Sequence, residues 1–323
     1  MDWPPITLGD VLDARRQIRP YLRETALHSY PALNELLDAE VWVKHENHQP
    51  VGSFKVRGGV NLVSRLSEEE RALGLISAST GNHGQSIAYA GLLFGVPVRI
   101  CVPEGANPVK VASMRGLGAE LIVHGADFDA AREHCEQLAR EHGYRYVHSG
   151  NEPHLIAGVA TGTLEIMEEQ PQIDVIVVPI GGGSGGAGAC IVAKATRPGI
   201  EVIGVQAEAA PAAFRSWSAR RLLEDSNATF AEGLATRTAF ELPQRILWDK
   251  LDDFVLVGED ELRRATLLMI EQTRNLTEPA GAAPLAAALK LRDRFRGKRV
   301  ALVLSGGNIS PAQLEDVLAM QRE

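Results

Sequence analysis

One stretch decides the fold class of this chain: Val175-Ile176-Val177-Val178-Pro179-Ile180-Gly181-Gly182-Gly183-Ser184-Gly185-Gly186-Ala187-Gly188. Its first six residues are apolar throughout, as in a parallel strand that helices cover on both faces. The next eight residues include six glycines, which let a backbone approach a bound phosphate closely. An alanine-rich run then predicts a helix over Gly186–Thr196. Strand, glycine loop and helix in this order predict an α/β protein.

The same alternation continues on both sides of this stretch. Short runs rich in β-branched residues alternate with amphipathic runs, which predicts mainly parallel, open, twisted sheets covered by helices. A chain of 323 residues is long enough for two lobes, and without a single break in composition we expect it to cross between them more than once. Strands are expected over Val41–Lys44, Leu75–Ala78, Val98–Val102, Glu120–Val123, Arg145–His148, Val175–Ile180, Glu201–Gln206, Phe254–Val257 and Val300–Leu304. Helices are expected over Val56–Leu66, His83–Phe94, Val109–Gly116, Asp127–Glu141, Pro153–Glu168, Gly186–Thr196, Asp260–Thr273, Ala282–Leu291 and Pro311–Met320, with Ser216–Thr238 irregular.

Composition argues against several classes of protein. The net charge is -8 and acidic and basic residues are interspersed, whereas nucleic-acid binders usually show a basic face. Met1–Pro20 lacks an apolar signal core and no apolar run approaches the length of a membrane span, so we expect no membrane partner and a cytoplasmic location. The three cysteines are widely spaced, which predicts reduced thiols rather than a disulfide framework or a zinc site.

Two motifs in the first third of the chain carry residues suited to chemistry. In Gly52-Ser53-Phe54-Lys55-Val56-Arg57-Gly58, a lysine follows a turn and begins a helix, where a desolvated amine could bind an aldehyde cofactor. A solvent-exposed lysine is the alternative. In Ser77-Ala78-Ser79-Thr80-Gly81-Asn82-His83-Gly84-Gln85, a strand leads into a helix whose first N–H groups could bind an anion. Helix capping would explain Ser79 or Thr80, but not the run from Gly81 to Gln85.

Two further motifs follow predicted strands. The glycine loop predicts a phosphate site, although a tight turn is the alternative. Its Gly181-x-Gly183-x-x-Gly186 spacing also matches a dinucleotide fingerprint, which keeps a nucleotide-dependent oxidoreductase as an alternative that gives Lys55 no role. Ser305-Gly306-Gly307-Asn308 places Ser305 at the carboxyl end of a strand, where open α/β sheets bind ligands, or is a simple turn.

In this order and at these spacings, the four motifs resemble the fold-type II pyridoxal-phosphate family, which includes tryptophan synthase β-like enzymes. The match is closest to threonine/serine dehydratases and serine racemases and runs from about Tyr30 to Asn308. The resemblance implies pyridoxal 5'-phosphate as cofactor, an amino acid as substrate and a homodimer. It also implies a large cofactor-binding domain of residues 1–52 plus 148–323 and a small substrate-gripping domain of residues 53–147.

The resemblance implies a role for each motif residue. Lys55 would hold the cofactor as a Schiff base and act as the catalytic base. Phe54 would pack by the cofactor ring, Asn82 would hydrogen-bond its 3′-oxygen, and Ser305 would meet its nitrogen. A serine there does not force protonation of that nitrogen, which suits prompt β-elimination. The phosphate would be held by Gly181, Gly182, Gly183, Ser184 and Gly185, and the substrate carboxylate by the loop of Ser79, Thr80, Gly81 and His83.

Several residues depart from the family's pattern. Thr80 stands where the family usually has a second serine, the acid/base of the racemases, so racemisation is less favoured. The segments His148–Asn151 and Ala157–Thr161 carry smaller or less polar residues than the family, which leaves room for a larger substrate or reflects repacking. Where part of the family binds a metal, Glu208 is the remaining carboxylate, so no metal site is predicted. Arg237 could face a second acidic group of the substrate, or form a surface ion pair.

The sequence therefore predicts a dehydratase (ammonia-lyase) that converts L-threonine, L-serine or a related 3-hydroxy amino acid to a 2-oxo acid and ammonia. A dehydratase of a specialised catabolic substrate, such as 3-hydroxyaspartate or an intermediate of hydroxyectoine use, would carry the same motifs. So would an amino-acid racemase on the same scaffold. From a different class, the sequence also allows the nucleotide-dependent oxidoreductase or a non-catalytic binding protein.

Overall fold

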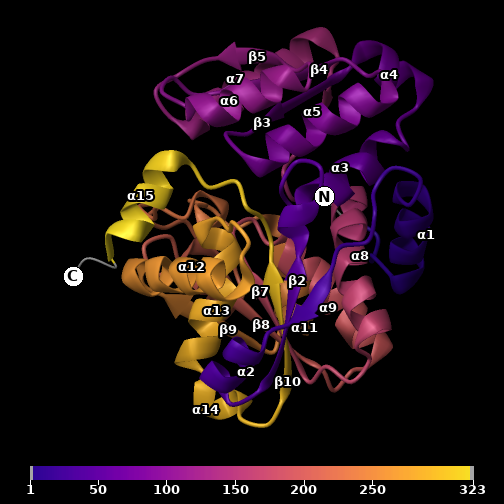
Figure 1. The fold of residues 1–323 in the computed structure, drawn as a ribbon. Helices are drawn as coiled ribbons and strands as arrows, with labels where there is room; N and C mark the ends of the chain where they lie inside the picture. The colour runs from indigo at the N-terminus through magenta and orange to yellow at the C-terminus, as the bar shows by residue number, and fades with distance from the viewer. Residues whose placement is uncertain (1–2, 321–323) are drawn as a thin grey trace.

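The computed structural model describes residues 3–320 and contains two sheets, each packed between helices (Figure 1). The larger sheet has six strands in the order β1-β2-β10-β7-β8-β9, and the smaller has four in the order β5-β4-β3-β6. The pairing of β1 with β2 is antiparallel, whereas the other pairings described are parallel. The predicted α/β class with mainly parallel sheets is confirmed.

The strands match their predicted positions to within one or two residues. The three-residue β1 was not expected, because so short a run shows no clear periodicity. The strands are β1 Leu27–Ser29, β2 Glu40–His45, β3 Leu75–Ala78, β4 Val98–Val102, β5 Glu120–Val123, β6 Arg145–Tyr146, β7 Val175–Pro179, β8 Glu201–Ala207, β9 Asp253–Val257 and β10 Arg299–Leu304.

All nine predicted helices are present, and six more were not predicted: α1, α2, α4, α10, α11 and α14. Two of these begin with a capping box, Thr7 with Asp10 in α1 and Ser67 with Glu70 in α4, a signal that the sequence does carry. The helices are α1 Leu8–Ile18, α2 Pro31–Leu37, α3 Lys55–Val63, α4 Glu68–Leu73, α5 Asn82–Phe94, α6 Pro108–Gly116, α7 Phe128–His142, α8 Pro153–Glu169, α9 Ser184–Thr196, α10 Ala212–Ala219, α11 Glu241–Lys250, α12 Glu259–Thr273, α13 Pro279–Lys290, α14 Arg292–Phe295 and α15 Pro311–Ala319. Short 3-10 turns lie at η1 Glu46–His48 and η2 Glu232–Leu234.

Strand β7, which leads into the glycine loop, is buried on both faces. Val175 and Val177 pack into the core that includes α12 and α13, whereas Ile176 and Val178 pack into the core that includes α8 and α9. Full burial of each such side chain contributes about 1.5–3 kcal/mol. Burial on both faces explains why β7 reads as a continuous apolar run and not as an alternating one.

The smaller sheet is formed from one continuous part of the chain. Its four strands lie between Leu75 and Tyr146, and the six strands of the larger sheet lie outside that range. Helix α3 packs against both α5 and α8, so it joins the two parts. The predicted division at residues 52/53 and 147/148 stays a prediction.

The structure contains neither a disulfide nor a membrane-spanning helix among the described residues. Cys101, Cys135 and Cys190 are buried and form no disulfide. Within residues 3–320, no helix combines the length and the apolar character needed to cross a membrane.

Candidate active site

A cleft of about 1460 Å³ brings the four sequence motifs together. Its walls are formed by the loops at the carboxyl ends of β3, β7 and β10 together with the start of α3, the edge at which parallel sheets bind ligands. Every residue predicted for the site lines it: Phe54, Lys55, Ser79, Thr80, Gly81, Asn82, His83, Gly181, Gly182, Gly183, Ser184, Gly185 and Ser305.

Lys55 is the first residue of α3, and its amine points into this cleft among neutral groups. Nζ donates to Ser184 Oγ at 2.8 Å and to the Ser149 carbonyl at 3.4 Å, and it lies 5.2 Å from the centre of the Phe54 ring. Desolvation lowers the pKa of Lys55 to about 8, compared with about 10.4 for a free lysine. Roughly a tenth of the amine is therefore unprotonated at pH 7, on the order of a hundred times more than for a free lysine. The unprotonated form is the nucleophile towards an aldehyde.

Two histidines beside Lys55 are neutral. Desolvation, followed by the charge of Lys55, lowers the pKa of His83 to about 3. Desolvation also lowers the pKa of His148 to about 4, with Arg132 and Lys55 adding to the effect. The Ser77 hydroxyl donates to the Val147 carbonyl, so the His83 Nε2–H donates to Ser77 Oγ at 3.0 Å. His83 is thus bonded to β3, a contact that the sequence did not suggest.

Asn82 is held on both sides of its amide group. Asn308 Nδ2 donates to Asn82 Oδ1 at 2.7 Å, and Asn82 Nδ2 donates to Glu278 Oε1, also at 2.7 Å. The second N–H of the Asn82 amide can still serve a ligand in the cleft. Glu278 is buried, and desolvation raises its pKa. Sequence reasoning missed Glu278, which belongs to no motif, and gave Asn308 no role although it ends the fourth motif.

The glycine loop leads into the N-terminus of α9. Gly183 is the N-cap residue with φ +90°, and no side chain caps the helix. The first N–H groups of a helix lack intrahelical acceptors, so this end of α9 suits a phosphate. Packing also demands glycine here, because a Cβ at Gly182 would collide with the Phe240 ring and one at Gly181 with the Gly233 carbonyl.

The loop before α5 combines capping with open space. Ser79 Oγ accepts hydrogen bonds from the N–H groups of Gly84 at 2.9 Å and Gly81 at 3.3 Å, so the capping alternative holds for this oxygen. A Cβ added to Gly81 would meet no atom within 4 Å. Packing therefore does not explain the glycine, and space is free there for a ligand.

Three other cations line the cleft. Lys110 Nζ pairs with Glu232 Oε2 at 2.5 Å. Arg132 and Arg237 share the carboxylate of Asp129 at 3.4 and 3.5 Å, and Arg132 Nε is buried without a partner. The Arg237 side chain is 62% exposed, so Arg237 both forms an ion pair and faces the cleft.

No metal site was predicted, and Gln206 stands where part of the family has a metal-binding carboxylate. Gln206 is buried and accepts a hydrogen bond from the Phe214 N–H. In the described part of the chain, no group of three or more His, Cys, Asp or Glu residues is placed to hold a metal ion.

These residues fit pyridoxal phosphate: a desolvated lysine amine, a helix N-terminus for the phosphate and an aromatic ring beside the amine. The fold and the cleft thus define a pyridoxal-phosphate-binding α/β enzyme. The chain belongs to the pyridoxal-phosphate dependent enzyme family, whose model matches residues 18–306.

Known relatives agree with this assignment. The chain is 39% identical to the L-threonine ammonia-lyase of Thermotoga maritima, over 97% of this chain and 78% of the relative. It is 37% identical to the L-threo-3-hydroxyaspartate ammonia-lyase of Saccharomyces cerevisiae, over 94% of this chain and 93% of the relative. Its structure matches the serine racemase of Dictyostelium discoideum with a TM-score of 0.89 and 35% identity, over 94% and 99% of the two chains.

Proposed function

We propose that this protein is an ammonia-lyase (dehydratase) that converts a 3-hydroxy amino acid of the L-threonine or L-serine class to a 2-oxo acid and ammonia. The observation that carries the proposal is the Lys55 amine, which is desolvated and lies 2.8 Å from Ser184 at the start of α9. An amine in this position can be bound by the cofactor aldehyde while the helix holds the phosphate. Two relatives that span most of this chain are named ammonia-lyases.

The residues around Lys55 supply the cofactor site in this proposal. The N–H groups and the hydroxyl of residues 181–185 hold the phosphate, Asn82 donates to the 3′-oxygen, and Ser305 meets the ring nitrogen. Phe54 packs beside the ring, and its N–H is bonded to the Ser305 carbonyl at 3.0 Å, which ties the two sides of the site together. Pyridoxal phosphate, when bound, supplies an aldehyde for the substrate amine and a ring that withdraws electrons from the α-carbon.

The protein's own groups then bind the substrate and move its proton. The loop of Ser79, Thr80 and Gly81 holds the substrate carboxylate at the start of α5, where the helix end favours an anion. The Lys55 amine takes the proton from the α-carbon as general base. The 3-hydroxyl group gains a proton and leaves as water, and one water molecule then hydrolyses the C–N bond of the dehydrated product to give the 2-oxo acid and ammonia. His83 and His148, with pKa values of about 3 and about 4, are much weaker bases than Lys55 and so do not compete for the α-carbon proton.

A second candidate substrate class is a hydroxy amino acid with a second carboxylate. Arg132 and Arg237 line the cleft on either side of Asp129, at distances of 3.4 and 3.5 Å that leave both guanidinium groups weakly bonded. A carboxylate on the substrate side chain could replace Asp129 between them. A relative with 37% identity is named for L-threo-3-hydroxyaspartate.

Location, assembly and domain division complete the proposal. Three buried cysteines without a disulfide fit a reducing compartment such as the cytoplasm. The homodimer and the division into domains of residues 1–52 plus 148–323 and 53–147 are carried by the family resemblance.

The test is to record the visible spectrum of the purified protein and of Lys55→Ala, and then to assay 2-oxo acid with L-threonine, L-serine and L-threo-3-hydroxyaspartate. We expect absorbance from lysine-bound cofactor in the wild type, its loss in Lys55→Ala, and 2-oxo acid from at least one substrate. Absence of the absorbance after addition of pyridoxal phosphate, or absence of product from all three substrates, would refute the proposal.

A further inference from the structure

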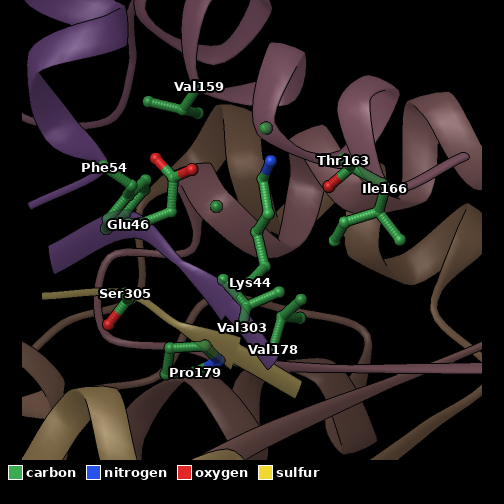
Figure 2. Close-up of a pocket in the computed structure, with 12 residues that line it drawn as sticks. Lys44, Glu46, Phe54, Val159, Thr163, Ile166, Val178, Pro179, Val303 and Ser305 are labelled. Carbon is green, nitrogen blue, oxygen red and sulfur yellow. The ribbon is translucent and has the colours of Figure 1, made fainter. Parts of the chain in front are cut away.

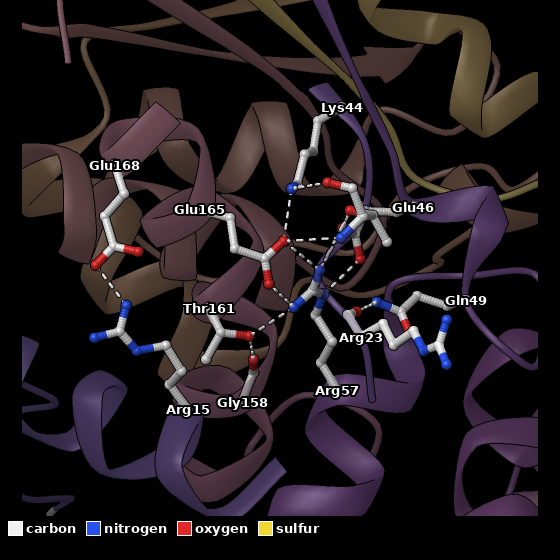
Figure 3. Close-up of polar contacts among 11 residues, drawn as sticks. Arg15, Arg23, Lys44, Glu46, Gln49, Arg57, Gly158, Thr161, Glu165 and Glu168 are labelled. Carbon is white, nitrogen blue, oxygen red and sulfur yellow. Dashed lines mark hydrogen bonds and ion pairs between the residues drawn. The ribbon is translucent and has the colours of Figure 1, made fainter. Parts of the chain in front are cut away.

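Four charged side chains are buried together beneath the helix that begins at Lys55 (Figure 3). Lys44 comes from β2, Glu46 from η1, Arg57 from α3 and Glu165 from α8. The side chains of Lys44 and Arg57 are each 1% exposed, and those of Glu46 and Glu165 are 2% and 6% exposed. Two cations balance two carboxylates, and the attraction between them offsets part of the large penalty of removing charges from water.

Arg57 is bonded through every nitrogen of its guanidinium group. It forms one two-bond pair with Glu46, at 2.7 and 2.8 Å, and another with Glu165, at 2.5 and 2.8 Å. It also donates to Thr161 Oγ1 at 3.2 Å and to Thr25 Oγ1 at 3.3 Å. A planar guanidinium that is paired twice in this way is fixed in direction as well as in place.

Lys55 has no comparable anchor of its own. Its hydrogen bonds to other described residues reach neutral oxygens of Ser184 and Ser149, and the N-cap residue of α3, Phe54, makes no side-chain capping bond. The place of the amine therefore follows from the backbone of α3. Lys55 and Arg57 are two residues apart, so they project from different sides of the helix. One side chain reaches the cleft and the other reaches the buried cluster.

A small cavity of about 30 Å³ joins the cluster to the cofactor site (Figure 2). Lys44 and Glu46 line it from the cluster, and Phe54, Gly185 and Ser305 line it from the site. Its volume suits about one water molecule, and most of its remaining lining is apolar, including Val159, Ile166 and Val303. The cluster is thus in contact, across this cavity, with residues on both sides of the expected cofactor ring.

We propose that Arg57 is a positioning residue, which clamps α3 onto η1 and α8 and thereby sets the direction from which the Lys55 amine meets cofactor and substrate. The inference rests on the proposed function of Lys55. A purely structural role would need only well-packed burial, which apolar side chains often supply equally well. The two two-bond pairs of Arg57 also fix the orientation of α3. The Lys55 amine depends on that orientation to meet the reacting atoms at a productive angle.

The test compares Arg57→Lys with Arg145→Lys. Both substitutions keep the charge and lose a two-bond pair with a glutamate. Arg145, however, lies on β6, pairs with Glu152 at the start of α8 and lies outside the cleft. Three quantities are measured for each variant: the melting temperature, the pH profile for capture of pyridoxal phosphate by the apoprotein, and kcat and KM for L-threonine. His83 and His148 face Lys55 with pKa values of about 3 and about 4, so neither titrates in the same pH range.

We expect Arg57→Lys to lower kcat on the order of 10- to 100-fold with little change in KM, because a misplaced amine loses near-attack geometry. We also expect the midpoint of the capture profile to rise by about one pH unit, because the displaced amine regains water. Arg145→Lys should lower the melting temperature but leave kcat and the midpoint unchanged.

Two results would overturn the proposal. The first is that Arg57→Lys and Arg145→Lys change kcat and the capture midpoint to the same extent. The second is that Arg57→Lys lowers the melting temperature but leaves kcat and the capture midpoint unchanged. If Arg57→Lys does not fold, Thr161→Val takes its place, because it removes the 3.2 Å hydrogen bond to Arg57. Its pH midpoint for capture of pyridoxal phosphate is then compared with that of the wild type. A smaller rise supports the proposal, and an unchanged midpoint overturns it. A wild-type protein that captures the cofactor yet forms no 2-oxo acid refutes the proposed function, while the capture profile still tests Arg57.

Discussion

Asn308 donates to the side-chain oxygen of Asn82 across 226 residues of sequence, with a donor–acceptor distance of 2.7 Å. The same Asn308 amide donates to the Val51 carbonyl, just before the lysine motif. One side chain thus links three of the four motifs. Since Glu278 accepts from the nitrogen of Asn82, the amide of Asn82 has one stable orientation, with an N–H left for the cofactor.

Loss of this link should weaken the cofactor site. In Asn308→Ala, Asn82 can rotate its amide and present oxygen instead of N–H. We expect pyridoxal phosphate to bind about tenfold more weakly, as for one lost hydrogen bond of about 1.5 kcal/mol. Titration of the apoprotein followed by absorbance measures the affinity. Asn275→Ala is the control, because Asn275 is bonded to His48 and Thr273 and lies outside the cleft.

Glu278 should make stability depend on pH. Desolvation raises its pKa, so the folded protein keeps this proton at a pH where the unfolded chain has released it. Its contribution to stability is therefore full below its unfolded pKa and is lost as pH rises through the higher folded value. Glu278→Gln can still accept from Asn82 and should melt at a higher temperature than the wild type near pH 7, with the difference shrinking towards pH 4. Equal pH profiles of the two melting temperatures would contradict this assignment.

The apoprotein should capture pyridoxal phosphate faster as pH rises. With a pKa of about 8, the Lys55 amine passes from mostly protonated to mostly free between about pH 7 and 9. We expect the capture rate to rise across this range and then to level off, as stopped-flow absorbance would show. A midpoint near 10.4, the usual value for an exposed lysine, would mean that Lys55 is not desolvated.

Two glycines should respond differently to alanine. Gly182→Ala drives a methyl group into the Phe240 ring and should destabilise the protein by about 1–3 kcal/mol, seen as a lower melting temperature. Gly81→Ala meets no atom within 4 Å and should leave the melting temperature almost unchanged. It should instead raise KM for the amino acid, because the methyl group occupies space expected for the substrate carboxylate.

Substitution of Arg237 distinguishes a substrate with a second carboxylate from one without. If a second carboxylate binds between Arg132 and Arg237, Arg237→Ala should raise KM for L-threo-3-hydroxyaspartate by roughly tenfold, the loss of one exposed charge-assisted contact of about 1.5 kcal/mol. Activity on L-threonine should not change. Equal effects on both substrates, or on neither, would favour the surface ion pair with Asp129 as the full role of Arg237.

Much of the fold and the site could be predicted because the signals are local. The apolar run of β7 and the glycines that follow it are contiguous in sequence, and the structure places every predicted site residue along one cleft. The strands were found to within one or two residues for the same reason, since periodicity and turn residues act over short distances.

The remaining features depend on contacts between distant segments. The bond of Asn82 to Glu278 spans 196 residues, and that of Arg57 to Glu165 spans 108. No spacing rule connects such pairs, because their partners meet only once the sheets are packed. Glu278 and Glu165 look in sequence like ordinary acidic residues, most of which are exposed. For Ser79 the sequence left two roles open, and its hydroxyl does accept from an N–H group in the first turn of α5, while its predicted contact with the substrate stays a prediction.

The strand order of the larger sheet has a consequence for how the molecule forms. Strand β10, the last in the chain, lies between β2 and β7 and pairs with both, at Val300 with Val41 and with Val175. During synthesis the lysine motif emerges early, yet the neighbouring strand β2 pairs only with β1 and is not joined to β7 until β10 leaves the ribosome. Such non-local pairing slows folding. We expect nascent chains that lack β10 to be unable to capture the cofactor, so the enzyme becomes competent in a single late step.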